Sequence, residues 1–228
     1  MNELADAERG LWTFHQPLSV MRAEIGTRMT VVRLSDGGLL VHSPIRWTEA
    51  LGARLEALGV VRHVLAPNLD HHLFVADFKS RYPEAVFYAT PGVQEKQPTL
   101  RFDEVLDGRR TVASWNDTVE QAWFRSSSEL QELVLLHRTS RALISADLAF
   151  NIQRSAGWLS RTLLRLNDSY ETFGPSRVCR AKITDRRMAR SDLDTILALE
   201  PDQMVLAHGE LLMTGTTEAL KRSYTWLT

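Results

Sequence analysis

Strand and helix signals alternate in two similar halves of this sequence, and that alternation constrains the fold more than any other feature. In the first half, β-rich runs at 29–34 and 39–42 flank the turn Ser35-Asp36-Gly37-Gly38, which predicts a hairpin. A helical pattern follows over 47–58, and the run 60–65 is typical of a short buried strand. A helical pattern also begins near Leu73 and continues to Arg81.

The second half shows the same alternation. Its predicted strands are 133–136, 142–145 and 204–207, and its predicted helices are 155–166, a segment from a capping box at Ser191 to about Leu199, and 217–226. Strand pairs that mix with helices in this way indicate an α/β layered fold. No linker interrupts the 228 residues, so we expect one domain over residues 1–228.

Composition narrows the kind of chemistry that the chain can carry. The net charge of −1 gives no global reason to expect nucleic acid or a membrane as partner. With Cys179 as its one cysteine, the chain can form no internal disulfide, and a metal would need histidine and carboxylate ligands. The acidic first residues lack the features of a signal peptide, and no apolar run approaches about 18 residues. We therefore expect a soluble, cytoplasmic protein.

Four potential metal ligands follow predicted strands. His71 and His72 lie beyond the strand 60–65, Asp147 closes the strand 142–145, and His208 directly follows the strand 204–207. Loops at strand ends are where ligands and catalytic groups collect in layered α/β folds. Each residue alone is a weak signal, because a strand-end histidine is more often a hydrogen-bonded structural residue than a ligand.

Taken in order, the runs 65–72, 144–147 and 205–209 resemble the metallo-β-lactamase superfamily, and more closely a bacterial branch with a degenerate metal motif. The similarity covers roughly 29–209. It implies a four-layer αββα sandwich, in which two mixed sheets are flanked by helices and a metal site lies at one edge. Members of this superfamily are mostly hydrolases that activate water with one or two Zn, Fe or Mn ions.

The resemblance also implies which ligands are missing. Pro67 and Leu69 stand where the first two histidines of the family's motif belong, and no histidine lies near Ser128, where a lone histidine is expected. Only the shared Asp147 therefore remains of the first metal site. The second site keeps four competent groups at the positions of its ligands, with a histidine in place of the motif's aspartate; these are His71, His72, Asp147 and His208.

This pattern predicts one divalent ion, with Zn favoured and Fe or Mn as alternatives. Adjacent side chains at a loop-to-helix junction diverge by only about 100°, so His71 and His72 could both reach one ion. The function that follows is a metal-dependent hydrolase with a mononuclear site. Asp147 would be its shared ligand, and Asp70 is a candidate general base that could equally be a turn residue. The expected partner is a small-molecule substrate.

Two other interpretations stay open. A non-catalytic member of the same fold, acting as a binding or interaction module, is favoured by the loss of ligands at Pro67 and Leu69. A nucleic-acid-binding protein would rest only on the segment Arg154–Arg190, where basic residues outnumber acidic ones. We interpret that segment as a solvated surface and expect no nucleic-acid partner. Because it falls between Asp147 and His208, it also makes an anionic substrate plausible.

Overall fold

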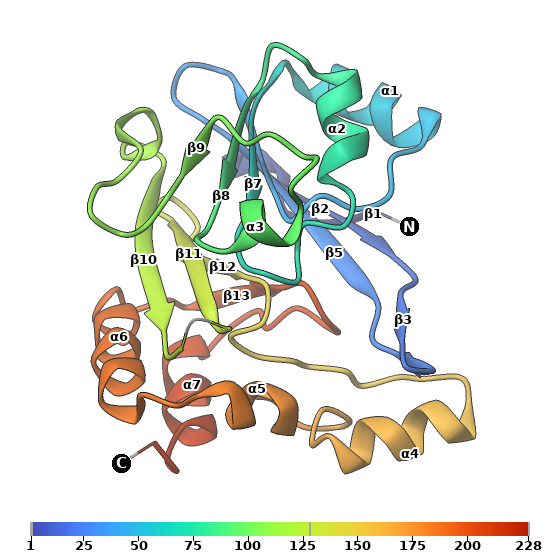
Figure 1. The fold of residues 1–228 in the computed structure, drawn as a ribbon, viewed down its shortest axis with the longest axis vertical. Coiled ribbons are helices and arrows are strands. Elements are labelled where there is room, and N and C mark those ends of the chain that lie inside the picture. Colours follow the sequence, from blue (N-terminus) through green and yellow to red (C-terminus); the bar gives the residue numbers. More distant parts are fainter. Residues whose placement is uncertain (1, 128, 228) are drawn as a thin grey trace.

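Figure 1 shows the computed structural model of the chain, which describes residues 2–127 and 129–227. Its larger sheet has seven strands in the order β1-β2-β5-β6-β7-β8-β9. The first four of these pair antiparallel, whereas β6 to β9 pair parallel. The bounds are β1 Asn2–Asp6, β2 Leu11–Gln16, β5 Thr27–Arg33, β6 Leu39–His42, β7 Val61–Ala66, β8 Val86–Ala89 and β9 Glu104–Val105.

The smaller sheet has the order β10-β11-β12-β13, and only its last pair is parallel. A separate hairpin is formed by β3 and β4. The bounds are β10 Val119–Arg125, β11 Gln131–His137, β12 Ala142–Ser145, β13 Gln203–Leu206, β3 Ser19–Val20 and β4 Ala23–Glu24.

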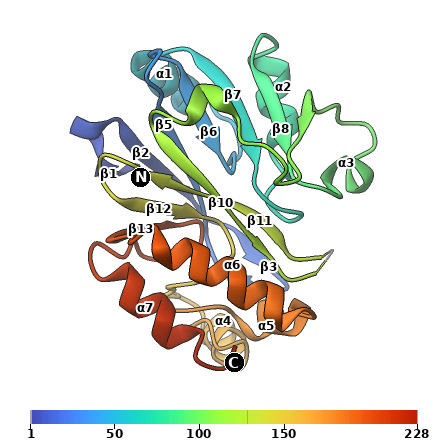
Figure 2. The same ribbon diagram turned by 90° about the vertical axis from the view of Figure 1, so that its left-hand side faces the viewer.

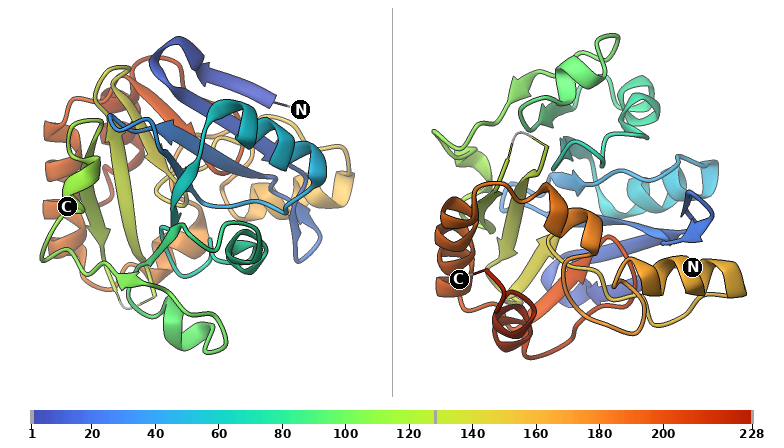
Figure 3. Two further views of the ribbon diagram at one scale, coloured as in Figure 1. Left: turned by 90° about the horizontal axis from the view of Figure 1, so that it is seen from above. Right: turned by 60° about the horizontal axis from the view of Figure 1, so that its bottom comes forward.

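Helices cover the outer faces of both sheets (Figure 2). The first half contributes α1 Glu49–Leu58, α2 Val75–Arg81 and α3 Val93–Lys96, and the second half α4 Trp158–Leu166, α5 Arg177–Lys182, α6 Arg186–Ala198 and α7 Thr216–Ser223. Figure 3 shows the same layering, with orange α6 outside the yellow-green strands and α1 outside the blue strands. The predicted αββα sandwich is therefore confirmed. None of the helices in the described part of the chain is long and apolar enough to cross a membrane.

Both sheets are buried on two faces, which is why central strands such as β6, Leu39–His42, and β12, Ala142–Ser145, are buried at every residue. Neighbouring residues of one strand point to opposite faces. On β7, Val64 packs under the helices of the first half, whereas Leu65 packs between the two sheets. On β12, Leu143 packs under the helices of the second half, whereas Ile144 faces the space between the sheets. Three apolar layers thus separate four layers of secondary structure.

The sequence patterns located the helices α1, α2, α4, α6 and α7 and the strands β5, β6, β7, β11, β12 and β13, with differences at several of their ends. The strands β1 to β4 and β8 to β10 and the helices α3 and α5 were not predicted. The predicted start of a helix at Ser191 is wrong, because α6 begins at Arg186 and the Asp185 side chain accepts a hydrogen bond from the Met188 amide at 2.9 Å. The helix predicted from near Leu73 begins at Val75, after a turn.

Candidate metal centre

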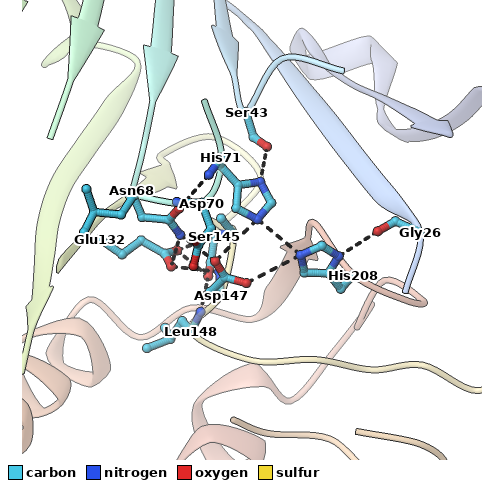
Figure 4. Close-up of polar contacts among 12 residues, drawn as sticks. Gly26, Ser43, Asn68, Asp70, His71, Glu132, Ser145, Asp147, Leu148 and His208 are labelled. Carbon is cyan, nitrogen blue, oxygen red and sulfur yellow. Dashed lines mark hydrogen bonds and ion pairs between the residues drawn. The ribbon is translucent and has the colours of Figure 1, made fainter. Parts of the chain in front are cut away.

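Three strands deliver the candidate ligands to one edge of the sandwich. His71 lies in the loop between β7 and α2, Asp147 follows β12, and His208 follows β13. Because β12 and β13 are parallel neighbours, their following loops emerge at the same edge of the smaller sheet. Figure 4 shows the three side chains pointing toward one another. Their potential ligand atoms all lie within 4.8 Å of one another.

The distances among these atoms are short. The Asp147 carboxylate lies 3.4 Å from His71 Nε2 and 3.5 Å from His208 Nε2, and the two Nε2 atoms are 3.2 Å apart. Each of the three side chains is at most 10% exposed. Charged or potentially charged groups that are this deeply buried need partners, and here each finds them in the other two.

Hydrogen bonds on the far side of each ring fix its orientation. His208 Nδ1 donates to the Gly26 carbonyl oxygen at 2.7 Å. A carbonyl only accepts, so in a neutral His208 the Nε2 atom keeps its lone pair and faces Asp147. His71 Nδ1 lies 2.6 Å from the Ser43 hydroxyl oxygen. The Phe150 ring stacks on His208 with its centroid 4.9 Å away, which further limits rotation of the imidazole.

Electrostatics inside the group favour a charged carboxylate. Burial alone would raise the pKa of Asp147, but His71 and His208 hold that pKa well below its usual range. Burial likewise would lower the pKa of His71, but the Asp147 carboxylate outweighs it and raises the pKa of His71. Asp147 is therefore held as a carboxylate between the two imidazoles.

A buried carboxylate behind Asp147 supports the group. Glu132 of β11 is 1% exposed. Its Oε1 atom accepts hydrogen bonds from Ser145 Oγ at 2.8 Å and the Ala146 amide at 2.6 Å. Its Oε2 atom accepts from the Asp147 amide at 2.7 Å. Glu132 therefore holds the main chain of the loop that carries Asp147.

Asn68 links that loop to the one that carries His71. Its Nδ2 atom donates to Asp147 Oδ2 at 2.8 Å and to Glu132 Oε2 at 3.3 Å. Its Oδ1 atom accepts from the amides of Asp70 and His71, both at 2.9 Å. Sequence reasoning missed Asn68 and Glu132. The one signal was an acidic residue at the start of the apolar run Leu133–Leu136.

The structure does not bring His72 into the group. His72 is 3% exposed, and both of its ring nitrogens are buried without a hydrogen-bond partner. The His72 carbonyl oxygen accepts a hydrogen bond from the Val75 amide at 3.1 Å, in the turn that precedes α2. His72 thus belongs to this turn, and its side chain does not join those of His71, Asp147 and His208. Burial and the charge of Lys96 lower the pKa of His72.

Asp70 lies beside the group but is already engaged. Its carboxylate pairs with Lys96 Nζ at 3.0 Å and Lys182 Nζ at 3.1 Å, and its side chain is half exposed. Partial burial raises its pKa, but the hydrogen bond from Lys96 and then that from Lys182 outweigh burial and lower it. A carboxylate held by two ammonium groups is a weak base, which disfavours the expected role of Asp70 in proton abstraction.

Two other buried groups, His42 and Cys179, lie in inert surroundings. Burial lowers the pKa of His42 to about 3, which keeps this histidine neutral. Burial raises the pKa of the Cys179 thiol to about 12, so Cys179 does not offer a reactive thiolate. Ser128, near which the family places its lone histidine, lies outside the described residues.

Comparison with known proteins supports the fold and identifies the family. A family model described as "Domain of unknown function (DUF4336)" matches residues 8–192. The chain belongs to this family. No curated protein matches the DUF4336 chain closely enough to count as a relative.

Solved structures similar to this DUF4336 chain are metallo-β-lactamases. The metallo-β-lactamase DIM-1 superposes with a TM-score of 0.65 at 10% identity, over 99% of this chain and 96% of its own. A metallo-β-lactamase from Pontibacter korlensis has a TM-score of 0.62 at 11% identity, with 97% and 99% covered. FIM-1 from Pseudomonas aeruginosa, solved in a mono-zinc form, has a TM-score of 0.61 at 11% identity, with 96% and 91% covered. At these identities the likeness shows the fold alone.

Proposed function

We propose that this DUF4336 protein is a metal-dependent hydrolase with a single-ion centre formed by His71, Asp147 and His208. The observation that carries the proposal is the convergence of two imidazole Nε2 atoms and one carboxylate within 4.8 Å. Zn, Fe and Mn all accept this donor set, and Zn suits it best. A bound ion would supply Lewis acidity and lower the pKa of a water molecule toward neutrality.

The number of ligands favours catalysis over a structural role. Structural zinc sites are closed by four protein ligands, whereas catalytic sites use three and leave one position for water or substrate. With His72 outside the group, the residues that the structure describes offer three ligands. FIM-1, which shares the fold, was solved with one zinc ion. Both observations support a centre that is mononuclear and open.

The protein's own side chains would orient the ligands. The Gly26 carbonyl and the Ser43 hydroxyl hold the two imidazoles with their Nε2 atoms toward Asp147. Hydrogen bonds of this kind fix the tautomer and raise the basicity of a ligating histidine. The Phe150 ring covers one face of His208 and limits access of water from that side.

We also propose that the substrate is a small molecule with an anionic group. The observation behind this is the pair Lys96 and Lys182, whose ammonium groups converge on the carboxylate of Asp70, next to His71. Burial would lower the pKa of Lys182, but Asp70 raises it, with a smaller contribution from the Asp147 carboxylate that shows how close Lys182 lies to the centre. The charges of Lys96, Lys182 and Asp70 sum to one positive charge beside the centre, and this charge favours the approach of an anionic substrate. A cytoplasmic location and the lack of a nucleic-acid partner stay predictions of the sequence.

Metal binding by the full-length chain tests the centre. The protein is stripped with a chelator, reloaded with Zn, Mn or Fe, and analysed for its metal content. We expect about one ion per chain, lost in His71→Ala, Asp147→Ala and His208→Ala. His137→Ala is the matched control, because His137 lies on β11 and bonds to Ser140 instead. Two tightly bound ions would contradict a mononuclear centre.

Hydrolysis is tested on the loaded protein with nitrophenyl esters and phosphate esters. We expect turnover that disappears in Asp147→Ala and stays in His137→Ala. Two results would favour a non-catalytic role: an ion that binds without turnover of either kind of ester, or no bound ion under any loading condition. The loss of the motif histidines at Pro67 and Leu69 is also compatible with such a role.

A further inference from the structure

Asn68 holds Asp147 at the same carboxylate oxygen that faces His71, and this arrangement bears on how many ions the centre can take. Its Oδ2 atom accepts a hydrogen bond from Asn68 Nδ2 at 2.8 Å. A carboxylate bridges two ions only when a lone pair on each side is free for a metal. The Asn68 amide nitrogen has hydrogens to donate and no lone pair to offer an ion.

Glu132 stabilises this arrangement from behind. Its two oxygens accept four hydrogen bonds, and the donors come from the end of β12, the loop after it and the loop after β7; they are Ser145 Oγ, the amides of Ala146 and Asp147, and Asn68 Nδ2. A carboxylate whose oxygens are saturated with N–H and O–H donors is not available as a metal ligand. Among the described residues, Glu132 belongs to no group that could hold an ion.

We infer that Asn68 and Glu132 form a hydrogen-bonded pair that restricts this centre to one ion and positions Asp147 as a terminal ligand. Asn68 takes one lone pair of Asp147 Oδ2, whose other lone pair faces His71, so that oxygen has none left for a second ion. Glu132 fixes the backbone from which the carboxylate extends. The inference rests on the proposed function, because it concerns the ion that His71, Asp147 and His208 would hold. It assigns roles to two residues that do not touch the ion.

The two roles predict different effects. Loss of an outer partner that orients a metal ligand typically weakens metal affinity about 10–100-fold. Glu132→Gln keeps the shape of the side chain but removes its charge. Backbone amides donate to both oxygens of Glu132. In either orientation, the NH2 group of the substituted glutamine would therefore face an N–H donor and could accept no hydrogen bond from it. We therefore expect Glu132→Gln to bind one ion about 10–100-fold more weakly than the natural chain.

Asn68→Asp tests whether the hydrogen bond from Asn68 to Asp147 keeps a second ion out. The substitution keeps an oxygen to accept from the amides of Asp70 and His71, so the loop retains its turn. It replaces the N–H donor by a second carboxylate oxygen, close to Asp147 and Glu132. The new carboxylate and that of Asp147 would then both offer oxygens, which are the ligands that hard divalent cations such as Mn prefer. We expect the number of bound ions to rise from one to two.

The experiment is calorimetric titration of the full-length, chelator-stripped protein with Zn and with Mn, and native mass spectrometry counts the bound ions. Glu120→Gln on β10 is the matched control for loss of a glutamate charge, because Glu120 pairs with Arg138 at the surface. Thermal unfolding of the metal-free variants checks that each is folded. Glu132→Asp, which restores the charge, should recover part of the lost affinity, a rescue that a purely structural role in packing would not give.

The outcomes separate this inference from the proposed function. One ion in the natural chain, an unchanged affinity in Glu132→Gln and a single ion in Asn68→Asp would overturn the inference and leave the proposed centre standing. Absence of any bound ion in the natural chain would overturn the proposed function itself. Weaker binding in Glu132→Gln but not in Glu120→Gln, with a second ion in Asn68→Asp, would support both roles.

Discussion

Gly209 directly follows His208, and replacing it with alanine should disturb the metal centre through the backbone. Its φ of +94° lies in a region that L-residues rarely adopt. A Cβ atom at this position would lie 2.1 Å from the Asn151 carbonyl oxygen and 2.6 Å from the Ile152 amide nitrogen. Both neighbours belong to the backbone, so no side chain can rotate away to make room.

The cost follows from these contacts. A non-glycine residue at positive φ costs roughly 1–2 kcal/mol. The clash would also stretch two hydrogen bonds, from the Asn151 amide to the His208 carbonyl at 3.1 Å and from the Glu210 amide to the Asn151 carbonyl at 2.8 Å. Each contributes about 1 kcal/mol. We expect Gly209→Ala to lower the free energy of unfolding by about 3–4 kcal/mol, and at 2–4 °C per kcal/mol the Tm by roughly 10 °C.

Gly37→Ala is the matched control for this prediction. Gly37 has a similar φ of +82°, but a Cβ there would meet no atom within 4 Å. It should therefore show the conformational cost alone, about 1–2 kcal/mol, and leave metal affinity unchanged. Calorimetric unfolding and metal titration of both variants give the comparison. Equal losses of Tm in Gly209→Ala and Gly37→Ala would refute the argument that close approach of the backbone requires glycine next to His208.

Three further outcomes follow from buried or paired groups. Burial lowers the pKa of His42 to about 3, against about 6.5 in the unfolded chain, so the contribution of His42 to stability should be constant above about pH 6.5 and fall by about 1.4 kcal/mol per pH unit from there down to about pH 3. His42→Gln should remove this slope from denaturation curves measured at several pH values. Asp192→Ala should cost about 2–3 kcal/mol in urea unfolding because three bonds from Arg125 end on that carboxylate, whereas the exposed Asp194→Ala should cost under about 0.5 kcal/mol. Lys182→Met should lower kcat/KM for phosphate esters about tenfold more than for uncharged esters, and equal losses would argue against an anionic substrate.

The sequence predicted the elements whose patterns are local. The hairpin of β5 and β6 has a glycine turn between two apolar runs, and that combination is decisive without tertiary contacts. The start of α6 was misplaced because Ser191 to Asp194 fits a capping pattern as well as Asp185 does. In the folded chain Asp192 instead binds Arg125 of β10, a contact between residues 67 positions apart. No local pattern contains that information.

The same limit applies to the centre. The sequence predicted that His71, Asp147 and His208 belong to the site because each of them follows a predicted strand, and a strand end can be located from sequence alone. Glu132 and Asn68 could not be found this way. Their hydrogen bonds to the Asp147 loop span 15 and 79 positions, and they acquire a role only when two sheets bring three loops together.

The choice between His71 and His72 also depends on a contact that the sequence does not display. Asn68 Oδ1 accepts from two successive amides and so fixes the backbone at Asp70 and His71. The next residue already contributes its carbonyl oxygen to the turn before α2, so its side chain leaves the cluster and lies buried without a hydrogen-bond partner. One asparagine thus holds the loop so that His71 joins the cluster and His72 does not, and it also donates to the Asp147 carboxylate. Both contacts of that side chain support the proposed centre with three ligands and a single ion.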